Sequence, residues 1–197
     1  MFNLRHQNDT TMLIGRKEEL RELNDAFKSE YSEFVAVYGR RRVGKTFLVR
    51  EAFNYEFTFQ HTGVAKEKIA GQLAAFRTSL IDYGYKDCPE LASWPDAFNS
   101  LKVGIKSSRK KKKVIFIDEI SWMDTPKSNF VSALEHFWNS WCSARKDVLL
   151  IICASATSWI INKVIKDRGG LHNRVNTQIY LMPFTLKERE EHLQSRN

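Results

Sequence analysis

The residues best suited to chemistry lie in one segment, Gly39-Arg40-Arg41-Arg42-Val43-Gly44-Lys45-Thr46, followed by Phe47. Two glycines separated by four residues and followed by Lys-Thr are typical of a loop that holds a polyphosphate. Glycine lets the backbone approach the phosphate closely, and the loop amides and the next helix N-terminus point at the anion. We expect Lys45 to reach the β- and γ-phosphates and Thr46 to ligate a bridging Mg²⁺. The simpler alternative is a glycine-containing turn with solvated basic residues.

Two adjacent carboxylates, Asp118 and Glu119, follow the apolar run 114–117. In phosphoryl transfer we expect Asp118 to hold the Mg²⁺, and Glu119 to orient and polarise the attacking water. Alternatively, this pair caps the next helix. Ser155 follows another apolar run, 148–154. It is expected to hydrogen-bond the γ-phosphate or the water, or else to be an ordinary turn hydroxyl.

These groups can meet only if the strands before them end beside one another. The hydrophobic pattern of the chain predicts such strands. Continuous apolar runs, typical of strands buried on both faces, occur at 34–37, 114–117 and 148–154. Shorter strands are predicted at 56–61 and 178–181. Helical periodicity and capping residues predict helices at 17–27, 46–53, 66–83, 95–107, 128–144 and 159–165, a break at 169–170, and a last helix opening at 185. The alternation predicts an α/β fold of three layers, a mostly parallel five-stranded sheet with helices on both faces. Ligands bind at the carboxyl ends of such strands.

The composition is that of one globular domain. The 197 residues are 43% hydrophobic, and we expect a loosely held tail at 1–11 followed by a core at 12–197. Three cysteines without C-x-x-C spacing indicate neither a disulfide framework nor a zinc site, and Cys153 is interpreted as a core thiol. The N-terminus lacks the apolar region of a signal peptide, and no run is long enough for a membrane span. We therefore expect no membrane partner and a cytoplasmic location.

The net charge of +8 permits nucleic acid as a partner without showing it. The densest cluster is Arg109-Lys110-Lys111-Lys112-Lys113, directly before a predicted buried strand. Such a run is interpreted as a solvated loop, with contact to nucleic acid as the alternative.

The chain resembles the archaeal-type ATPase family of the AAA+ and STAND P-loop NTPases. The resemblance covers nearly the whole chain and lies in four segments: 14–20, 37–46, 115–119 and 153–157. It implies ATP and Mg²⁺ as ligands, Asp118-Glu119 as the Walker B pair, and Ser155 at the sensor 1 position. It also implies that Ile14, Gly15 and Arg16 lie near the adenine.

The resemblance further suggests that Arg174 occupies the place of an arginine finger, which would make a homo-oligomer; a surface salt bridge or a solvated arginine is equally open. Family members continue after a segment like 182–185 into a helical lid and often a C-terminal domain. The chain stops at Asn197, so we expect a core truncated before its lid, with weak turnover.

Two functions follow from these observations. The first is magnesium-dependent hydrolysis of ATP to ADP and phosphate that drives a conformational change. The alternative is a nucleotide-dependent switch or a DNA-binding module with little hydrolysis. Phosphate release with and without DNA separates them.

Overall fold

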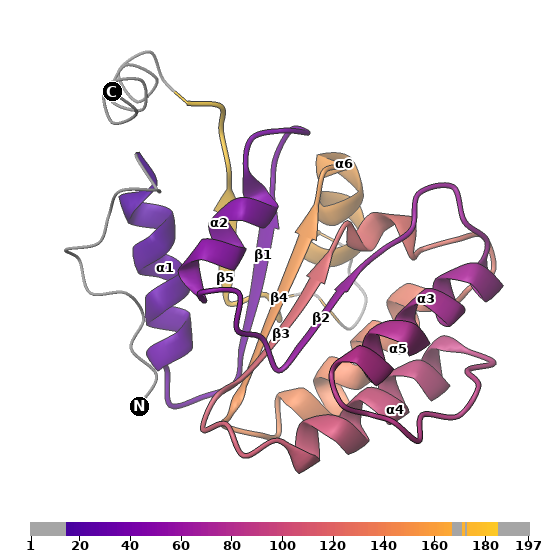
Figure 1. Cartoon of the computed structure of the whole chain (residues 1–197). Coiled ribbons are helices and arrows are strands. Elements are labelled where there is room, and N and C mark those ends of the chain that lie inside the picture. Colours follow the sequence, from indigo (N-terminus) through magenta and orange to yellow (C-terminus); the bar gives the residue numbers. More distant parts are fainter. Residues whose placement is uncertain (1–14, 167–170, 172, 185–197) are drawn as a thin grey trace, which may run out of the picture.

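The fold is built on a five-stranded sheet in the order β2-β3-β4-β1-β5, and every strand pair in it is parallel (Figure 1). The computed structural model describes residues 15–166, 171 and 173–184. Its strands are β1 (Glu33–Tyr38), β2 (Phe59–Thr62), β3 (Lys113–Asp118), β4 (Val148–Ala154) and β5 (Thr177–Tyr180). Its helices are α1 (Lys17–Lys28), α2 (Lys45–Ala52), α3 (Ile69–Asp82), α4 (Trp94–Ser107), α5 (Phe130–Phe137) and α6 (Thr157–Ile160). Shorter helical turns are η1 (Ile120–Trp122), η2 (Trp138–Cys142) and η3 (Ile161–Ile165).

Helices cover both faces of the sheet, which confirms the predicted three layers (Figure 1). Side chains alternate along each strand, so Val35 and Val37 of β1 pack with α1 and α2, whereas Phe34 and Ala36 pack with α3, α4 and α5. β4 is buried along its whole length because it lies in the middle of the sheet. Burial also raises the pKa of the Cys153 thiol on β4 well above its ordinary value, which confirms an inert core cysteine.

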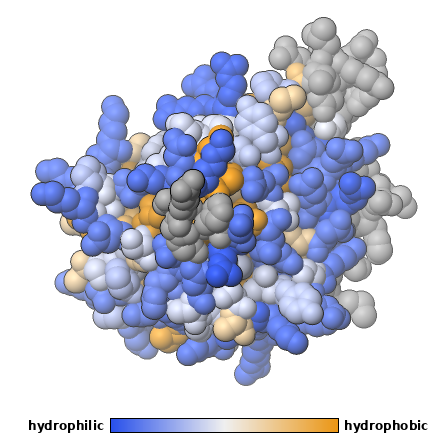
Figure 2. All heavy atoms as spheres, turned by 180° about the vertical axis from the view of Figure 1, so that it is seen from behind, coloured by the Kyte–Doolittle hydropathy of each residue, from blue (hydrophilic) through white to orange (hydrophobic). Residues whose placement is uncertain are grey.

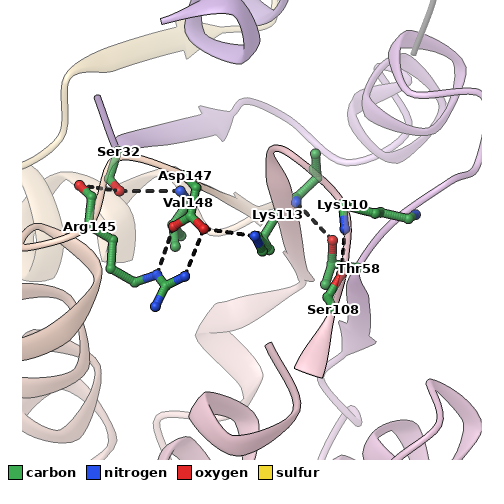
Figure 3. A network of polar contacts seen from close by, with 9 residues as sticks. Ser32, Thr58, Ser108, Lys110, Lys113, Arg145, Asp147 and Val148 are labelled. Carbon is green, nitrogen blue, oxygen red and sulfur yellow. Dashed lines mark hydrogen bonds and ion pairs between the residues drawn. The ribbon is translucent and has the colours of Figure 1, made fainter. Parts of the chain in front are cut away.

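Polar contacts fix the strands where they begin, at the amino edge of the sheet (Figure 3). Asp147 accepts two hydrogen bonds of 2.7 Å from Arg145 and one of 2.8 Å from Lys113. Burial alone would raise the pKa of Asp147, but these cationic donors hold it below its ordinary value. The Ser32 hydroxyl donates to the Arg145 carbonyl and accepts from the Val148 amide, which ties β1 to β4.

The largest departure from the predicted elements is at the start of β2. The alternating residues 56–61 predict a strand from residue 56, but β2 begins at Phe59. Asn54 and Tyr55 both have positive φ and form a turn before it. Phe57 lies between this turn and β2 and is buried, with its ring 5.3 Å from that of Phe116, so its burial does not require a strand.

Three helices are shorter than their apolar periodicity predicts. α3 begins at Ile69 rather than 66, because Lys66 has a positive φ of 60°. The segment predicted at 128–144 begins as α5 at Phe130 and widens into a π-helical turn after Phe137. The segment predicted at 159–165 likewise divides into α6 and the π-helical η3.

The other predicted features of the chain ends lie outside the described residues: the tail at 1–11, the break at 169–170 and the helix opening at 185. Within the described ranges, no helix combines the length and apolar character needed to cross a membrane.

Candidate nucleotide site

The glycine-bounded loop connects β1 to α2 at the carboxyl edge of the sheet. Gly39 has a φ of 150°, and a Cβ there would lie 2.3 Å from the Leu181 carbonyl oxygen, so this close approach requires glycine. Gly44 has a φ of 91° and immediately precedes α2. The two glycines therefore turn the chain out of the sheet and into the helix, as the motif predicts.

The Lys45 side chain is buried and closes the loop on itself. Its Nζ donates to the Gly39 carbonyl at 3.0 Å and the Arg40 carbonyl at 2.9 Å. It also donates to the Ser155 hydroxyl at 3.2 Å, at the end of β4. The ammonium is thus held at the mouth of the loop, between two strand ends.

Thr46 and Asp118 meet across the sheet. The Thr46 hydroxyl donates to Asp118 Oδ2 at 2.7 Å, and the Glu119 amide donates to Asp118 Oδ1 at 2.9 Å. Burial raises the pKa of Asp118, although these two donors counteract part of the rise. A desolvated carboxylate beside a hydroxyl fits a hard cation, because oxygen atoms are the ligands that Mg²⁺ prefers.

No cluster of three or more His, Cys, Asp or Glu side chains suited to a metal occurs within the part of the chain that the structure describes. Mg²⁺ is usually bound by one or two protein oxygens together with water and phosphate.

Glu119 is held in an uncommon backbone conformation, with a φ of 45°. Its side chain does not cap the following turn. Instead, Oε1 accepts from the Ser155 hydroxyl at 2.5 Å, and Oε2 accepts from the Ser155 amide at 3.3 Å. The geometry therefore does not support the helix-cap alternative for Glu119, and Ser155 is more than an unpaired turn hydroxyl.

The strand order explains why these residues meet. β4 lies between β1 and β3, so the end of β4 separates the loop after β1 from the carboxylates after β3. Ser155 consequently connects Lys45 to Glu119 through hydrogen bonds. The result is one continuous polar site that combines an ammonium, two hydroxyls and two carboxylates.

Arg16 joins the segment before α1 to the segment after β5. Its guanidinium donates to the Met182 carbonyl at 2.7 Å, pairs with Glu19 at 3.2 Å and lies 4.3 Å from the ring centroid of Phe184. It also reaches the Val43 carbonyl at 3.5 Å, so this corner touches the loop. A role of Gly15 and Arg16 near adenine stays a prediction, and Ile14 lies outside the described residues.

Of the remaining loop residues, Val43 is partly buried against the core beside α2, and the three arginines face outward. Arg40, Arg41 and Arg42 are exposed, and Arg42 has a positive φ of 66°. Phe47, in the first turn of α2, is 43% exposed. These side chains are available to a ligand or partner without any rearrangement of the core.

Arg174 is not part of this site in its own chain. It is exposed and lies just before β5, where Asn176 pairs with Phe34 at the beginning of β1. From Phe34 to Gly39 the strand spans about 17 Å at its usual rise. Its side chain is exposed at this edge, so a role as an arginine finger across an interface stays a prediction.

Two supporting contacts were not predicted from the sequence. Gln72 of α3 is fully buried, and it bonds both the Val64 backbone and the Trp122 carbonyl at 2.9 Å, behind Glu119. The sequence feature that could have predicted this contact is a glutamine on the apolar face of a helix, four residues before Phe76. Asp124 accepts from Trp159 at 2.8 Å and joins the segment after β3 to α6.

Comparison with known proteins places this geometry among nucleotide-binding proteins. Residues 13–194 match the family model described as an ATPase domain predominantly from Archaea. An uncharacterised protein of Methanocaldococcus jannaschii is 26% identical over 182 residues, which are 91% of this chain and 38% of that protein. An uncharacterised ATP-binding protein of the same organism is 42% identical over 40 residues, 20% of this chain and 68% of that protein.

Solved structures share the fold. The Walker-type ATPase of Pyrococcus abyssi has a TM-score of 0.64 at 17% identity and covers 98% of this chain. The ORC2 protein of Aeropyrum pernix, solved as ADPNP-ADP complexes, has a TM-score of 0.66 at 16% identity and covers 93%. Cdc6p of Pyrobaculum aerophilum has a TM-score of 0.59 at 14% identity and covers 100%. This chain spans 60%, 52% and 51% of those three chains, respectively.

Proposed function

The chain belongs to the ATPase-domain family found predominantly in Archaea, and we propose that it binds ATP with Mg²⁺ and hydrolyses it to ADP and phosphate, driving a conformational change. The observation that carries the proposal is the hydrogen-bonded connection from Lys45 through Ser155 to Glu119, beside the Thr46–Asp118 pair. A turn with only a structural role does not require these five polar groups to meet at one edge of a sheet.

The phosphates would lie on the loop between Gly39 and Gly44. Its amides and the N-terminus of α2 supply donors, and Lys45 would exchange contacts with its own loop carbonyls for contacts with the β- and γ-phosphates. Thr46 and Asp118 would hold Mg²⁺, which neutralises charge on the phosphate oxygens.

Glu119 would orient the attacking water and accept its proton. A carboxylate has about four lone-pair sites, so it can keep its contacts to Ser155 and still accept from water. Ser155 fixes the direction of the carboxylate and would also contact the γ-phosphate.

A second function, a nucleotide-dependent switch with little hydrolysis, is favoured by one observation. Both carboxylate oxygens of Glu119 accept hydrogen bonds from Ser155. If these contacts turn the carboxylate away from the attacking water, the chain would bind nucleotide and turn it over slowly.

The test is calorimetry with ATP and Mg²⁺, followed by measurement of phosphate release. The parent should bind ATP, and Lys45→Ala should lose most of that affinity, whereas the exposed Lys86→Ala should keep it. Equal affinity of Lys45→Ala and the parent would disprove the site. Binding with no phosphate release above background would favour the switch.

A further inference from the structure

The positive charge of the chain is concentrated at one end of the sheet. Each strand is preceded by a segment at the amino edge, opposite the nucleotide site. Together these segments form what we call the basic edge: residues 28–33, 52–59, 107–113, 142–148 and 173–177. They contain nine Lys and Arg residues against four Asp and Glu, a net +5 out of the +8 of the whole chain. The basic edge is thus far more positive than the rest of the molecule.

The lysine run is built into this surface rather than simply solvated. Lys112 Nζ donates to the Ser29 carbonyl at 2.9 Å and the Tyr31 carbonyl at 2.5 Å. Lys110 Nζ donates to the Phe57 carbonyl at 3.2 Å. The run therefore bridges the segment before β1 and the segment before β2. Between and beside these anchors, Lys111 and Arg109 are exposed.

An exposed tyrosine lies in each of the two bridged segments. Tyr31 is 66% exposed and Tyr55 is 55% exposed. The exposed Lys146 adds a further cation, with its Nζ 5.9 Å from the centroid of the Tyr31 ring. Cations and aromatic rings are thus interleaved across the surface.

Large aliphatic side chains do not accompany them. Among the described residues, the exposed large hydrophobic side chains of the basic edge are these two tyrosines. The lower end of the molecule in Figure 2, which includes this edge, is coloured mainly as hydrophilic. The surface therefore lacks the aliphatic anchor that a membrane would favour and the apolar centre typical of a protein interface.

We propose that the basic edge binds single-stranded nucleic acid, with Arg109, Lys111 and Lys146 contacting phosphates and Tyr31 stacking on a base. Proteins that bind single strands combine a positive track for the backbone with aromatic rings for the bases. A duplex offers the same phosphates but keeps its base faces stacked, so the tyrosines would gain nothing from it. Because the two sites lie at opposite edges of the sheet, ATP and nucleic acid can be bound together.

The test is fluorescence anisotropy with a labelled oligothymidine of about 20 nucleotides and with a duplex of equal length. The triple variant Arg109→Ala/Lys111→Ala/Lys146→Ala should weaken binding of the single strand about 10- to 100-fold at 0.1 M salt and reduce the salt slope by about 2. The matched control Arg21→Ala/Lys86→Ala/Lys163→Ala removes the same charge from exposed positions elsewhere and should change affinity only slightly. Equal losses in the two triple variants would overturn the proposal.

Two further arms separate the proposed surface from other sources of binding. Tyr31→Ala should weaken single-strand binding about fivefold or more, while Tyr31→Phe keeps the ring and should bind like the parent. Saturating ATP with Mg²⁺ should leave oligothymidine bound. Displacement by ATP would assign binding to the exposed arginines 40–42 of the nucleotide loop instead. Tighter binding of the duplex than of the single strand would also overturn the proposal.

Discussion

Ser155 holds Glu119 by two contacts, a hydroxyl hydrogen bond of 2.5 Å to Oε1 and an amide hydrogen bond of 3.3 Å to Oε2. The same hydroxyl accepts a hydrogen bond of 3.2 Å from Lys45. A change in the position of Ser155, or in what its hydroxyl contacts, therefore reaches both the group proposed to bind phosphate and the group proposed to act on water.

Ser155→Ala should slow ATP hydrolysis more than it weakens ATP binding. The variant keeps the backbone amide but loses one hydrogen bond to a charged carboxylate, which corresponds to roughly 10- to 100-fold in rate. ATP affinity should stay within a few-fold, because the variant keeps Lys45 and the loop amides, the groups proposed to bind the phosphates. Ser155→Thr should restore much of the rate, and the exposed Ser158→Ala serves as the control. An unchanged rate in Ser155→Ala would show that the hydroxyl does not position Glu119.

Glu119→Gln should separate binding from chemistry. Glutamine has nearly the same shape and can still contact Ser155, but it lacks the charge that polarises water. Hydrolysis should fall by roughly 10²–10⁴-fold, typical of a lost general base, while ATP affinity is retained. Steady-state phosphate release and calorimetry measure the two effects, with exposed Glu90→Gln as the control. Parallel loss of binding and turnover would assign Glu119 a structural role.

Asp118→Asn should remove the magnesium dependence of nucleotide binding. The buried carboxylate beside Thr46 is the only proposed protein charge on the cation, so the variant should bind ATP about equally with and without Mg²⁺. The parent should bind more tightly with Mg²⁺ present. Calorimetry of ATP in Mg²⁺ and in a chelator gives both values. A variant that retains the full effect of Mg²⁺ would exclude Asp118 as its ligand.

Local patterns predicted the parts of the fold that depend on local chemistry. The glycine-lysine motif predicts the loop, and α2 begins within one residue of its predicted start because Gly44 is in the left-handed conformation. The apolar runs before Asp118 and Ser155 are strands because both of their faces are buried. The prediction of β2 was less accurate, since Phe57 is buried in the core from the link before the strand.

The connections within the site depend on strand order, which no local pattern encodes. The Ser155–Glu119 pair forms because β4 lies between β1 and β3, although 36 positions separate the two residues. The role of Gln72 was not predicted either, because its partners are backbone groups, of Val64 eight positions before it and of Trp122 fifty positions after it. The sequence therefore predicted which polar residues lie at this edge of the sheet better than how they contact one another.

Arg174 should act only between chains, if it acts in catalysis at all. It lies at the amino edge of β5 and cannot reach the nucleotide site of its own chain. An arginine supplied by a neighbour contributes about 10³–10⁵ in rate in related reactions. Specific ATPase activity should therefore rise with protein concentration, and Arg174→Ala should flatten the rise without changing ATP affinity. The exposed Lys166→Ala is the control.

Mixing Arg174→Ala with Glu119→Gln protein gives the sharper test of the same prediction. Each variant lacks a group that the other can supply across an interface, so activity should reappear in the mixture. Turnover that is independent of concentration and unaffected by Arg174→Ala would identify this arginine as an ordinary surface residue, or one that serves only the basic edge.

His61 should make the folded chain sensitive to mild acid. Its ring packs edge-on against Phe76, and Nδ1 lies 2.9 Å from the Ser79 hydroxyl. That hydroxyl donates to the Ala75 carbonyl, so Nδ1 carries the proton and donates to Ser79. Nε2 is then a buried acceptor that has no hydrogen-bond partner among the residues the structure describes. Burial lowers the pKa of His61 from 6.5 to about 4, since a charge at Nε2 would be desolvated.

The direction of the pH dependence of stability follows from proton uptake by the unfolded chain. Below pH 6.5 the unfolded chain binds a proton at this residue that the folded chain refuses until about pH 4, so the free energy of unfolding falls as the pH drops through this window. Between pH 7 and 5 the loss from His61 is about 2 kcal/mol. Urea unfolding at pH 7 and pH 5 gives the free energy of unfolding at each pH. Its decrease between the two should be about 2 kcal/mol smaller in His61→Phe than in the parent. The missing Ser79 contact lowers the stability of the variant equally at both pH values, so it does not affect this difference. The exposed His136→Phe should keep the dependence of the parent. Equal pH dependence in parent and His61→Phe would mean that His61 becomes protonated in the folded chain as readily as in the unfolded one.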